Sequence, residues 1–267
     1  MAQEKWMIDG PKTIDIEMIR KLKVGLIAGQ VNVVGHDEPT TRVEVHSVVG
    51  RELKITVDGD TLEIDHPQLR WDNFVEVFSS WRGGTARADI SIQVPRDVAL
   101  KFGVISASGL ITGLTEDASI STVSGDLVID NVYGDLQLNA VNGEVAVRSH
   151  YGSINAHTVS GDITASGEIM RFTADTVSGD VFLDITGVPD EIRVNTISGS
   201  VTTRLAADVA AQYRINTVSG RLQLDNSEIR GIRGAYTGKF GNLEKRWLDF
   251  KANTVSGDIS VLHAVSA

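Results

Sequence analysis

A nine-residue pattern of apolar and polar positions occurs seven times between residues 122 and 184. When the bend glycine of each repeat is numbered 4, positions 6 and 8 are apolar in every repeat, and position 7 is mixed. This alternation predicts a short strand with one buried face, because successive side chains of a strand point to opposite sides. Position 2 is valine in most repeats, and we predict that these valines form a further inward column: Val123, Val132, Val141, Val159 and Val177.

A glycine recurs where each strand is expected to end. Glycine adopts positive φ at little steric cost, and the Ser, Asn, Asp and Glu side chains beside it can hydrogen-bond to the backbone of a turn. Repeats containing Ser-Gly-Asp alternate with repeats containing Tyr-Gly, so the full period is 18 residues. We assign a structural turn role to Gly125, Gly134, Gly143, Gly152, Gly161, Gly179, Gly199, Gly220 and Gly257.

A fixed period of this kind is typical of a solenoid. Two strands and two bends would make one coil, and stacked coils would bury their apolar columns against one another. We therefore predict an all-β fold, a parallel β-solenoid (β-helix) with coils of about 18 residues, right-handed because parallel crossovers almost always are. An antiparallel meander of hairpins is the alternative, but it does not explain why odd and even repeats differ so regularly.

The pattern divides the chain into an N-terminal β region, residues 1–99, and a repeat solenoid, residues 100–267. In the first part, residues 53–57 and 62–64 flank Asp58-Gly59, a strong hairpin signal, and further strands are expected at 23–34, 42–46 and 88–94. This region would form an antiparallel cap or irregular coils that cover one end of the solenoid. In the second part, the Thr-Val/Ile-Ser-Gly phrase returns at Gly199, Gly220 and Gly257, and the last interval is predicted to span about two coils.

Two aromatic-rich segments interrupt the pattern, at residues 67–84 and 228–253. Exposed aromatic side chains near arginine and lysine are typical of docking surfaces, but the same side chains could instead plug the ends of a solenoid. Both interpretations stay open. The candidate partner-binding residues are Trp71, Phe74, Phe78 and Trp81 in the first segment, and Tyr236, Phe240 and Trp247 in the second.

The net charge of −10 and the absence of a Lys/Arg run argue against nucleic-acid binding. No apolar run approaches the ~18 residues of a membrane span, and the N-terminus has no secretory signal pattern. We therefore expect a cytoplasmic protein that would reach a membrane only through a partner. Homo-oligomers are compatible with the sequence.

Side chains that could bind a metal or take part in catalysis follow the repeat without forming a known site. Asp126, Glu144, Asp162 and Asp180 are predicted to stack at one bend, but their spacing lacks the paired glycines of the calcium-binding β-roll, so solvated turn acids are favoured over a metal site. No histidine has a second ligand at metal-binding spacing. The serine column lacks a nucleophile motif. We expect no catalytic residue, no cofactor and no metal.

The repeated Thr-Val-Ser-Gly-Asp phrase, the opening Glu4-Lys5-Trp6 and the stretch Glu63–Pro67 resemble the bacterial β-strand-repeat family called "putative adhesin" or Toastrack. The resemblance implies a β-helix-like fold without established catalysis, and a sensing or scaffolding role beside membrane stress proteins. The expected function is a non-catalytic scaffold or protein-interaction module in the cell-envelope stress response. The alternatives are a cell-surface adhesin or carbohydrate-active β-helix, and a self-assembling filament scaffold.

Overall fold

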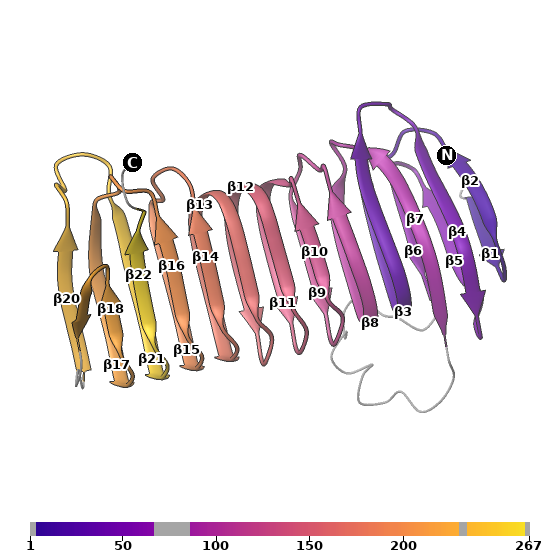
Figure 1. The fold of residues 1–267 in the computed structure, drawn as a ribbon. Coiled ribbons are helices and arrows are strands. Elements are labelled where there is room, and N and C mark those ends of the chain that lie inside the picture. The colour runs from indigo at the N-terminus through magenta and orange to yellow at the C-terminus, as the bar shows by residue number, and fades with distance from the viewer. Residues whose placement is uncertain (1–3, 67–85, 230–233, 265–267) are drawn as a thin grey trace. The chain divides into compact units, whose positions relative to one another are not determined.

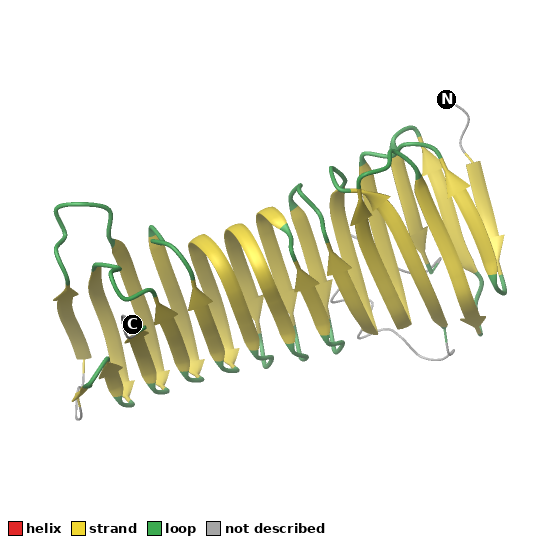
Figure 2. Cartoon of the chain, turned by 45° about the horizontal axis from the view of Figure 1, so that its top comes forward, coloured by secondary structure: helices red, strands yellow, loops and turns green. Residues whose placement is uncertain are grey.

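The computed structural model describes residues 4–66, 86–229 and 234–264, and all the regular structure in these ranges is β-strand (Figure 2). None of the described residues belongs to a helix that could cross a membrane. The chain forms two compact units, Met1–Gly134 and Asp135–Ala267. The all-β prediction is confirmed.

Ten strands lie entirely within the described residues of unit 1. They are β1 (Glu4–Ile8), β2 (Lys12–Ile16), β3 (Lys21–His36), β4 (Thr41–Val49), β5 (Leu53–Asp58), β6 (Thr61–Asp65), β7 (Arg87–Pro95), β8 (Ala99–Thr112), β9 (Ala118–Thr122) and β10 (Leu127–Asp130). The strand β11 (Tyr133–Ala140) runs across the boundary.

Strand β3 is the centre of unit 1, although it comes early in the sequence. It pairs in parallel with β6 and β7 on one side and with β8 on the other. Its inward side chains continue those of its neighbours: Val24 pairs with Ile64 and with Phe102, and all three are at most 1% exposed. The hairpin predicted at Asp58-Gly59 is confirmed, since β5 and β6 pair antiparallel with Asp58 opposite Thr61. Antiparallel pairing of β1 with β5, and of β2 and β7 with β4, completes this unit.

In unit 2, eleven strands follow β11 among the residues that the structure describes. They are β12 (Val145–Thr158), β13 (Ile163–Ser178), β14 (Val181–Ile185), β15 (Glu191–Ser198), β16 (Val201–Leu205), β17 (Ala211–Ser219), β18 (Leu222–Leu224), β19 (Ser227–Ile229), β20 (Gly234–Phe240), β21 (Leu248–Ser256) and β22 (Ile259–His263).

The strands of unit 2 stack in parallel in two series, as expected of a solenoid. In one series Ile154, Phe172, Ile192, Phe250 and Tyr213 are consecutive partners, and in the other Ile163, Val181, Val201, Ile259 and Leu222. These ten side chains are at most 3% exposed. The parallel pairing contradicts the antiparallel meander, and the apolar alternation that predicted the strands is therefore the alternation that fills the core.

The order of coils in space differs from their order in the sequence. Strand β21 pairs in parallel with both β15 and β17, and β22 pairs in parallel with both β16 and β18 (Figure 1). The C-terminal coil is thus inserted between two coils that precede it. The prediction that the interval from Gly220 to Gly257 spans two further coils is wrong. Residues 248–253 of the predicted insert are also part of this coil, where Leu248 and Phe250 are fully buried.

The repeated phrase faces the core in the opposite phase to the one predicted. Six threonines, Thr122, Thr158, Thr176, Thr196, Thr217 and Thr254, are at most 6% exposed. The hydroxyl of Thr122 accepts a hydrogen bond from the Gly125 amide at 3.0 Å, and that of Thr158 accepts one from the Gly161 amide at 3.2 Å. With threonine turned inward, the next residue must point away, and Val159 and Val177 are 48% and 45% exposed. The predicted inward column is therefore wrong for these two valines. Val141 is half-buried, and Val123 and Val132 are buried, Val123 even though it follows the inward Thr122.

A buried histidine in unit 1 is expected to make its stability depend on pH. The ring of His66 is fully buried, its Nδ1 accepts a hydrogen bond from the Ile27 amide at 3.2 Å, and burial lowers the pKa of His66 from 6.5 to about 4. Between these pH values the folded state then binds fewer protons than the unfolded chain. The contribution of His66 to the free energy of unfolding is therefore fully present above about pH 6.5. It is lost as the pH falls towards 4, by up to about 3 kcal/mol. Urea unfolding of unit 1 at pH 7 and pH 4.5 measures this difference.

The matched variant for this measurement is His66→Asn, whose side-chain oxygen can still accept the Ile27 amide but does not titrate. It should be less sensitive to this pH change than the wild type. Asp65 acts in the opposite direction, because burial raises its pKa and the folded state then gains protons first as the pH falls. Asp65→Asn removes that contribution. Equal pH dependence in wild type and His66→Asn would contradict the assignment.

Candidate functional site

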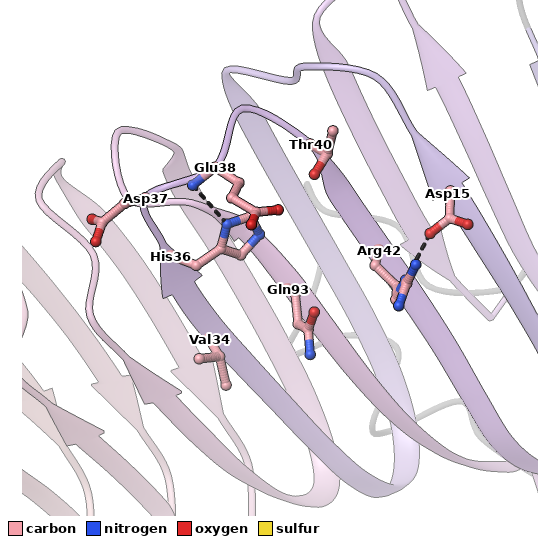
Figure 3. A pocket seen from close by; sticks show the side chains of 8 residues that line it. All are labelled: Asp15, Val34, His36, Asp37, Glu38, Thr40, Arg42 and Gln93. Atoms are coloured by element: carbon pink, nitrogen blue, oxygen red, sulfur yellow. Dashed lines mark hydrogen bonds and ion pairs between the residues drawn. The ribbon is translucent and has the colours of Figure 1, made fainter.

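One pocket lies in unit 1 at the ends of β2, β3, β4 and β7, and Figure 3 shows the side chains that line it. His36 Nδ1 accepts a hydrogen bond from the Glu38 amide at 3.1 Å, and Arg42 Nε donates to Asp15 at 2.7 Å. The Arg42–Asp15 hydrogen bond raises the pKa of Arg42. The pocket is lined by Asp15, Val34, His36, Asp37, Glu38, Thr40, Arg42 and Gln93.

This pocket does not have the features of an active site. Its charged groups are open to water, with the side chains of Asp15 and Asp37 68% and 84% exposed, and both carboxylates are already paired with arginines, Arg42 and Arg96. Within the described ranges, no group of three His, Cys, Asp or Glu residues could hold a metal ion. His36 is the last residue of β3, and the exposed Asp37 and Glu38 follow it in the bend.

The acidic column of unit 2 has a structural role in the turns. The Asp162 carboxylate accepts a hydrogen bond from the Asp180 amide at 2.8 Å, 18 residues further along the chain. Asp180 accepts one from the Ser200 amide at 2.7 Å, and Asp258 accepts one from the Arg221 amide at 2.9 Å. Each carboxylate therefore satisfies a backbone amide of the neighbouring coil, which a turn would otherwise leave to water.

A second polar ladder crosses the outer face of the same unit. Asn195 Nδ2 donates to Asp175 at 2.7 Å, Asn253 to Asn195 at 2.7 Å, and Asn216 to Asn253 at 2.7 Å. His157 lies 3.4 Å from Asp175 at the beginning of the ladder. The side chains interlock from coil to coil, and the order of the three asparagines follows the inserted C-terminal coil.

Charged side chains on this face likewise form ion pairs between coils. Lys251 Nζ lies 2.7 Å from Asp249 and 2.8 Å from Glu191, and these two contacts raise the pKa of Lys251. Arg214 reaches Asp249 at 3.5 Å. This network links β15, β21 and β17, the three strands whose order in space the sequence does not predict.

Among the described residues of unit 2, exposed large apolar side chains gather along the turn edge. We call this group the aliphatic ladder: Val159, Val177, Ile197, Val255 and Val218, which are 48%, 45%, 53%, 49% and 63% exposed. The paired threonines and serines on either side fix their order, since Thr176 and Ser178 pair with Thr196 and Ser198, these with Thr254 and Ser256, and these with Thr217 and Ser219. These residues are the valine and isoleucine of the repeated Thr-Val/Ile-Ser-Gly phrase. The sequence therefore marks the ladder, but the predicted phase placed the valines of this phrase in the core.

The predicted aromatic partner-binding residues divide into two groups. Trp71, Phe74, Phe78 and Trp81 lie outside the described residues. Tyr236, Phe240 and Trp247 are each partly exposed, and the Phe240 ring stacks on His263 at 3.8 Å between centroids. His263 in turn places its ring nitrogens 3.0 Å from the Asp225 carboxylate and 3.0 Å from the Val209 carbonyl oxygen. Phe240 thus packs against the end of the inserted coil, and a partner-binding role for the aromatic residues stays a prediction.

Seven of the nine predicted turn glycines lie between strands, whereas Gly134 lies within β11 and Gly152 lies within β12. In unit 2 the glycines between strands are closely packed. A Cβ atom on Gly161, Gly179 or Gly199 would lie within 2.3 Å of the carbonyl oxygen of the glycine in the preceding coil. Gly179 also has φ of 148°, a value that other residues rarely adopt. The glycine column therefore allows adjacent coils to approach closely.

Comparisons with known proteins give one family match and several similar crystal structures. Residues 19–262 match the family described as Toastrack DUF4097. A crystal structure named a "putative adhesin" from Bacteroides fragilis is 13% identical with a TM-score of 0.52, and the alignment covers 94% of this chain and 97% of that one. A "putative adhesin" and a "putative lipid binding protein" from Parabacteroides distasonis are 15% and 12% identical, cover 98% and 97% of this chain and 97% and 99% of theirs, and have TM-scores of 0.37 and 0.36.

None of these three structures is named as an enzyme, and no curated protein matches the sequence. The likeness to the Bacteroides structure concerns the fold alone. The family match extends over both compact units and includes every repeat on which the sequence-based resemblance was founded. The chain therefore belongs to the Toastrack DUF4097 family.

Proposed function

We propose that this chain is a non-catalytic interaction module, in which stacked coils hold a binding surface rigidly. The proposal treats each unit as a right-handed solenoid with coils of about 18 residues, as the repeat predicts. The observation that carries it is a contrast on the surface of unit 2. Polar side chains there form hydrogen bonds from coil to coil, while the side chains of the aliphatic ladder stay exposed. Contiguous exposed apolar side chains are typical of surfaces that bind another macromolecule.

The proposed partner is a protein of the bacterial cell-envelope stress response. Support for this partner comes from the family resemblance, since such families often accompany membrane stress proteins. The chain would be held at the membrane by that partner. An adhesin role is the second candidate, and it is supported by the name of the Bacteroides fragilis structure.

Site-specific photo-crosslinking in the native host tests the proposal. A photoreactive residue at Val177 or Val255 should yield a discrete protein adduct, whereas the same residue at Thr202, on the other series of strands, should not. A membrane stress protein in the adduct would support the proposed partner. Adducts equal at ladder and control positions would contradict binding at this edge, and adducts with carbohydrate or with proteins of other cells would favour the adhesin role.

A further inference from the structure

The exposure of the aliphatic ladder is a property of unit 2 and is not imposed by the fold. In unit 1 the Ser124 amide donates to the Ile105 carbonyl at 2.8 Å, as the Ser178 amide donates to Val159 at 2.8 Å in unit 2. The Ser106 hydroxyl donates to the Ile27 carbonyl, as the Ser178 hydroxyl does to Val159. The equivalents of the ladder in unit 1 are therefore Ile27, Ile105 and Val123, and these are 1%, 3% and 4% exposed. The same column is covered in one unit and bare in the other.

The charges beside the ladder indicate what kind of molecule could cover it. Exposed carboxylates of Asp162, Asp180 and Asp258 follow three residues after Val159, Val177 and Val255, and each accepts a hydrogen bond from a backbone amide. Asp175 lies two residues before Val177 on the other side. These acids, in a chain of net charge −10, disfavour an anionic lipid surface and a second copy of the same edge. They favour a partner with basic residues beside an apolar stripe.

The spacing of the ladder indicates the conformation of the partner. Side chains of adjacent coils repeat every ~4.8 Å, so five of them span roughly 19 Å. A helix lying along the ladder presents one side chain per turn every ~5.4 Å, and its stripe falls out of step by only about 2–3 Å over that length. An extended strand along the same line presents side chains every ~6.8 Å and falls out of step by roughly 8 Å. A helix fits the ladder better than a strand.

We propose that the aliphatic ladder of unit 2 is the docking site for a basic amphipathic helix of a partner protein. The apolar stripe of the helix would pack along Val159, Val177, Ile197, Val255 and Val218, and its lysines and arginines would face the aspartates. This inference rests on the proposed function and specifies the partner of the same surface.

Labelled synthetic helices of about 14 residues, long enough to span the ladder, test the proposal with the full chain. One carries a leucine stripe flanked by lysines, the second the same stripe flanked by glutamates, and the third the lysines with the leucines scattered. Fluorescence anisotropy should show binding of the first helix. The variant Val177→Ser/Ile197→Ser/Val255→Ser should weaken this binding by about tenfold or more, since burial of apolar surface would supply most of the affinity.

The charge requirement has its own matched variant. Asp180→Asn/Asp258→Asn keeps a side-chain oxygen that can accept the Ser200 and Arg221 amides, so the turns should persist, and circular dichroism and thermal unfolding check this for every variant. The double variant should weaken binding of the lysine helix by about threefold and reduce its dependence on salt. Binding of the glutamate helix or of the scattered helix as tightly as the first would overturn the proposal, as would an unchanged affinity in the serine variant. If crosslinking at Val177 captures a partner whose contact segment is not a basic helix, this inference fails while the interaction function stands.

Discussion

Replacing Phe250 by alanine is expected to lower the free energy of unfolding of unit 2 by about 3–5 kcal/mol, the usual cost of removing a fully buried phenylalanine. The ring is 0% exposed and lies between Ile192 and Tyr213 in the inward column. The Phe250 and Tyr213 rings pack in a T-shaped arrangement, with 6.1 Å between their centroids. Urea unfolding followed by circular dichroism measures the loss.

The position of Phe250 makes this variant a test of the inserted coil. Because β21 pairs with both β15 and β17, the variant should lose hydrogen-exchange protection on both of these strands. A terminal coil would lose it on one side only, and that outcome would contradict the inserted order. Phe182→Ala is the control, since its ring is 36% exposed on β14, and it should cost less than about 1 kcal/mol.

Replacing Gly199 by alanine is the second variant with a large expected effect. The new Cβ would lie 2.2 Å from the Gly179 carbonyl oxygen, a distance at which the backbone of one coil must move. The Gly199 carbonyl oxygen in turn lies 2.1 Å from the place of a Cβ on Gly257, so a shift on one side reaches the inserted coil on the other. We expect a loss of about 2–4 kcal/mol in the free energy of unfolding, typical of backbone strain in a packed interior.

Gly10→Ala is the matched control for this effect. Gly10 has no atom within 4 Å of the position of a Cβ, and its φ lies outside the positive range. It should change stability by less than about 0.5 kcal/mol. A comparable loss in both variants would show that the glycine column is not a close-packed seam. The measurement is again the urea midpoint at neutral pH.

The core and the strands of this protein follow from the sequence with little ambiguity. Positions 6 and 8 of the repeat, such as Leu127 and Ile129, are buried as predicted, because alternation over a short strand leaves only one face that can avoid water. The hairpin at Asp58-Gly59 is equally local, since two turn residues determine its register. His150 is buried and stands at a register shift between β12 and β13.

The candidate site was harder to predict, because it depends on whether the threonine or the valine of the repeated phrase faces the core. Threonine and valine differ little in their fit to a strand, and apolar character alone favoured valine for the core. In unit 2 the hydrogen bond from the Gly161 amide holds the Thr158 side chain inward, and Val159, the first residue of the surface ladder, then faces outward. Composition and spacing do not contain this hydrogen bond.

The amino-acid sequence by itself determined that the protein is built of stacked strands with glycine at the turns, since period, alternation and turn chemistry are local properties. Only the tertiary structure decided which coil lies beside which. The phrases Thr217–Gly220 and Thr254–Gly257 are equivalent as partners for β15, so pairing of either with that strand would satisfy the same backbone groups and bury the same kinds of side chain. Strand β20 pairs antiparallel with β17, and the C-terminal coil pairs between β15 and β17. This order depends on contacts between residues that are far apart in the chain.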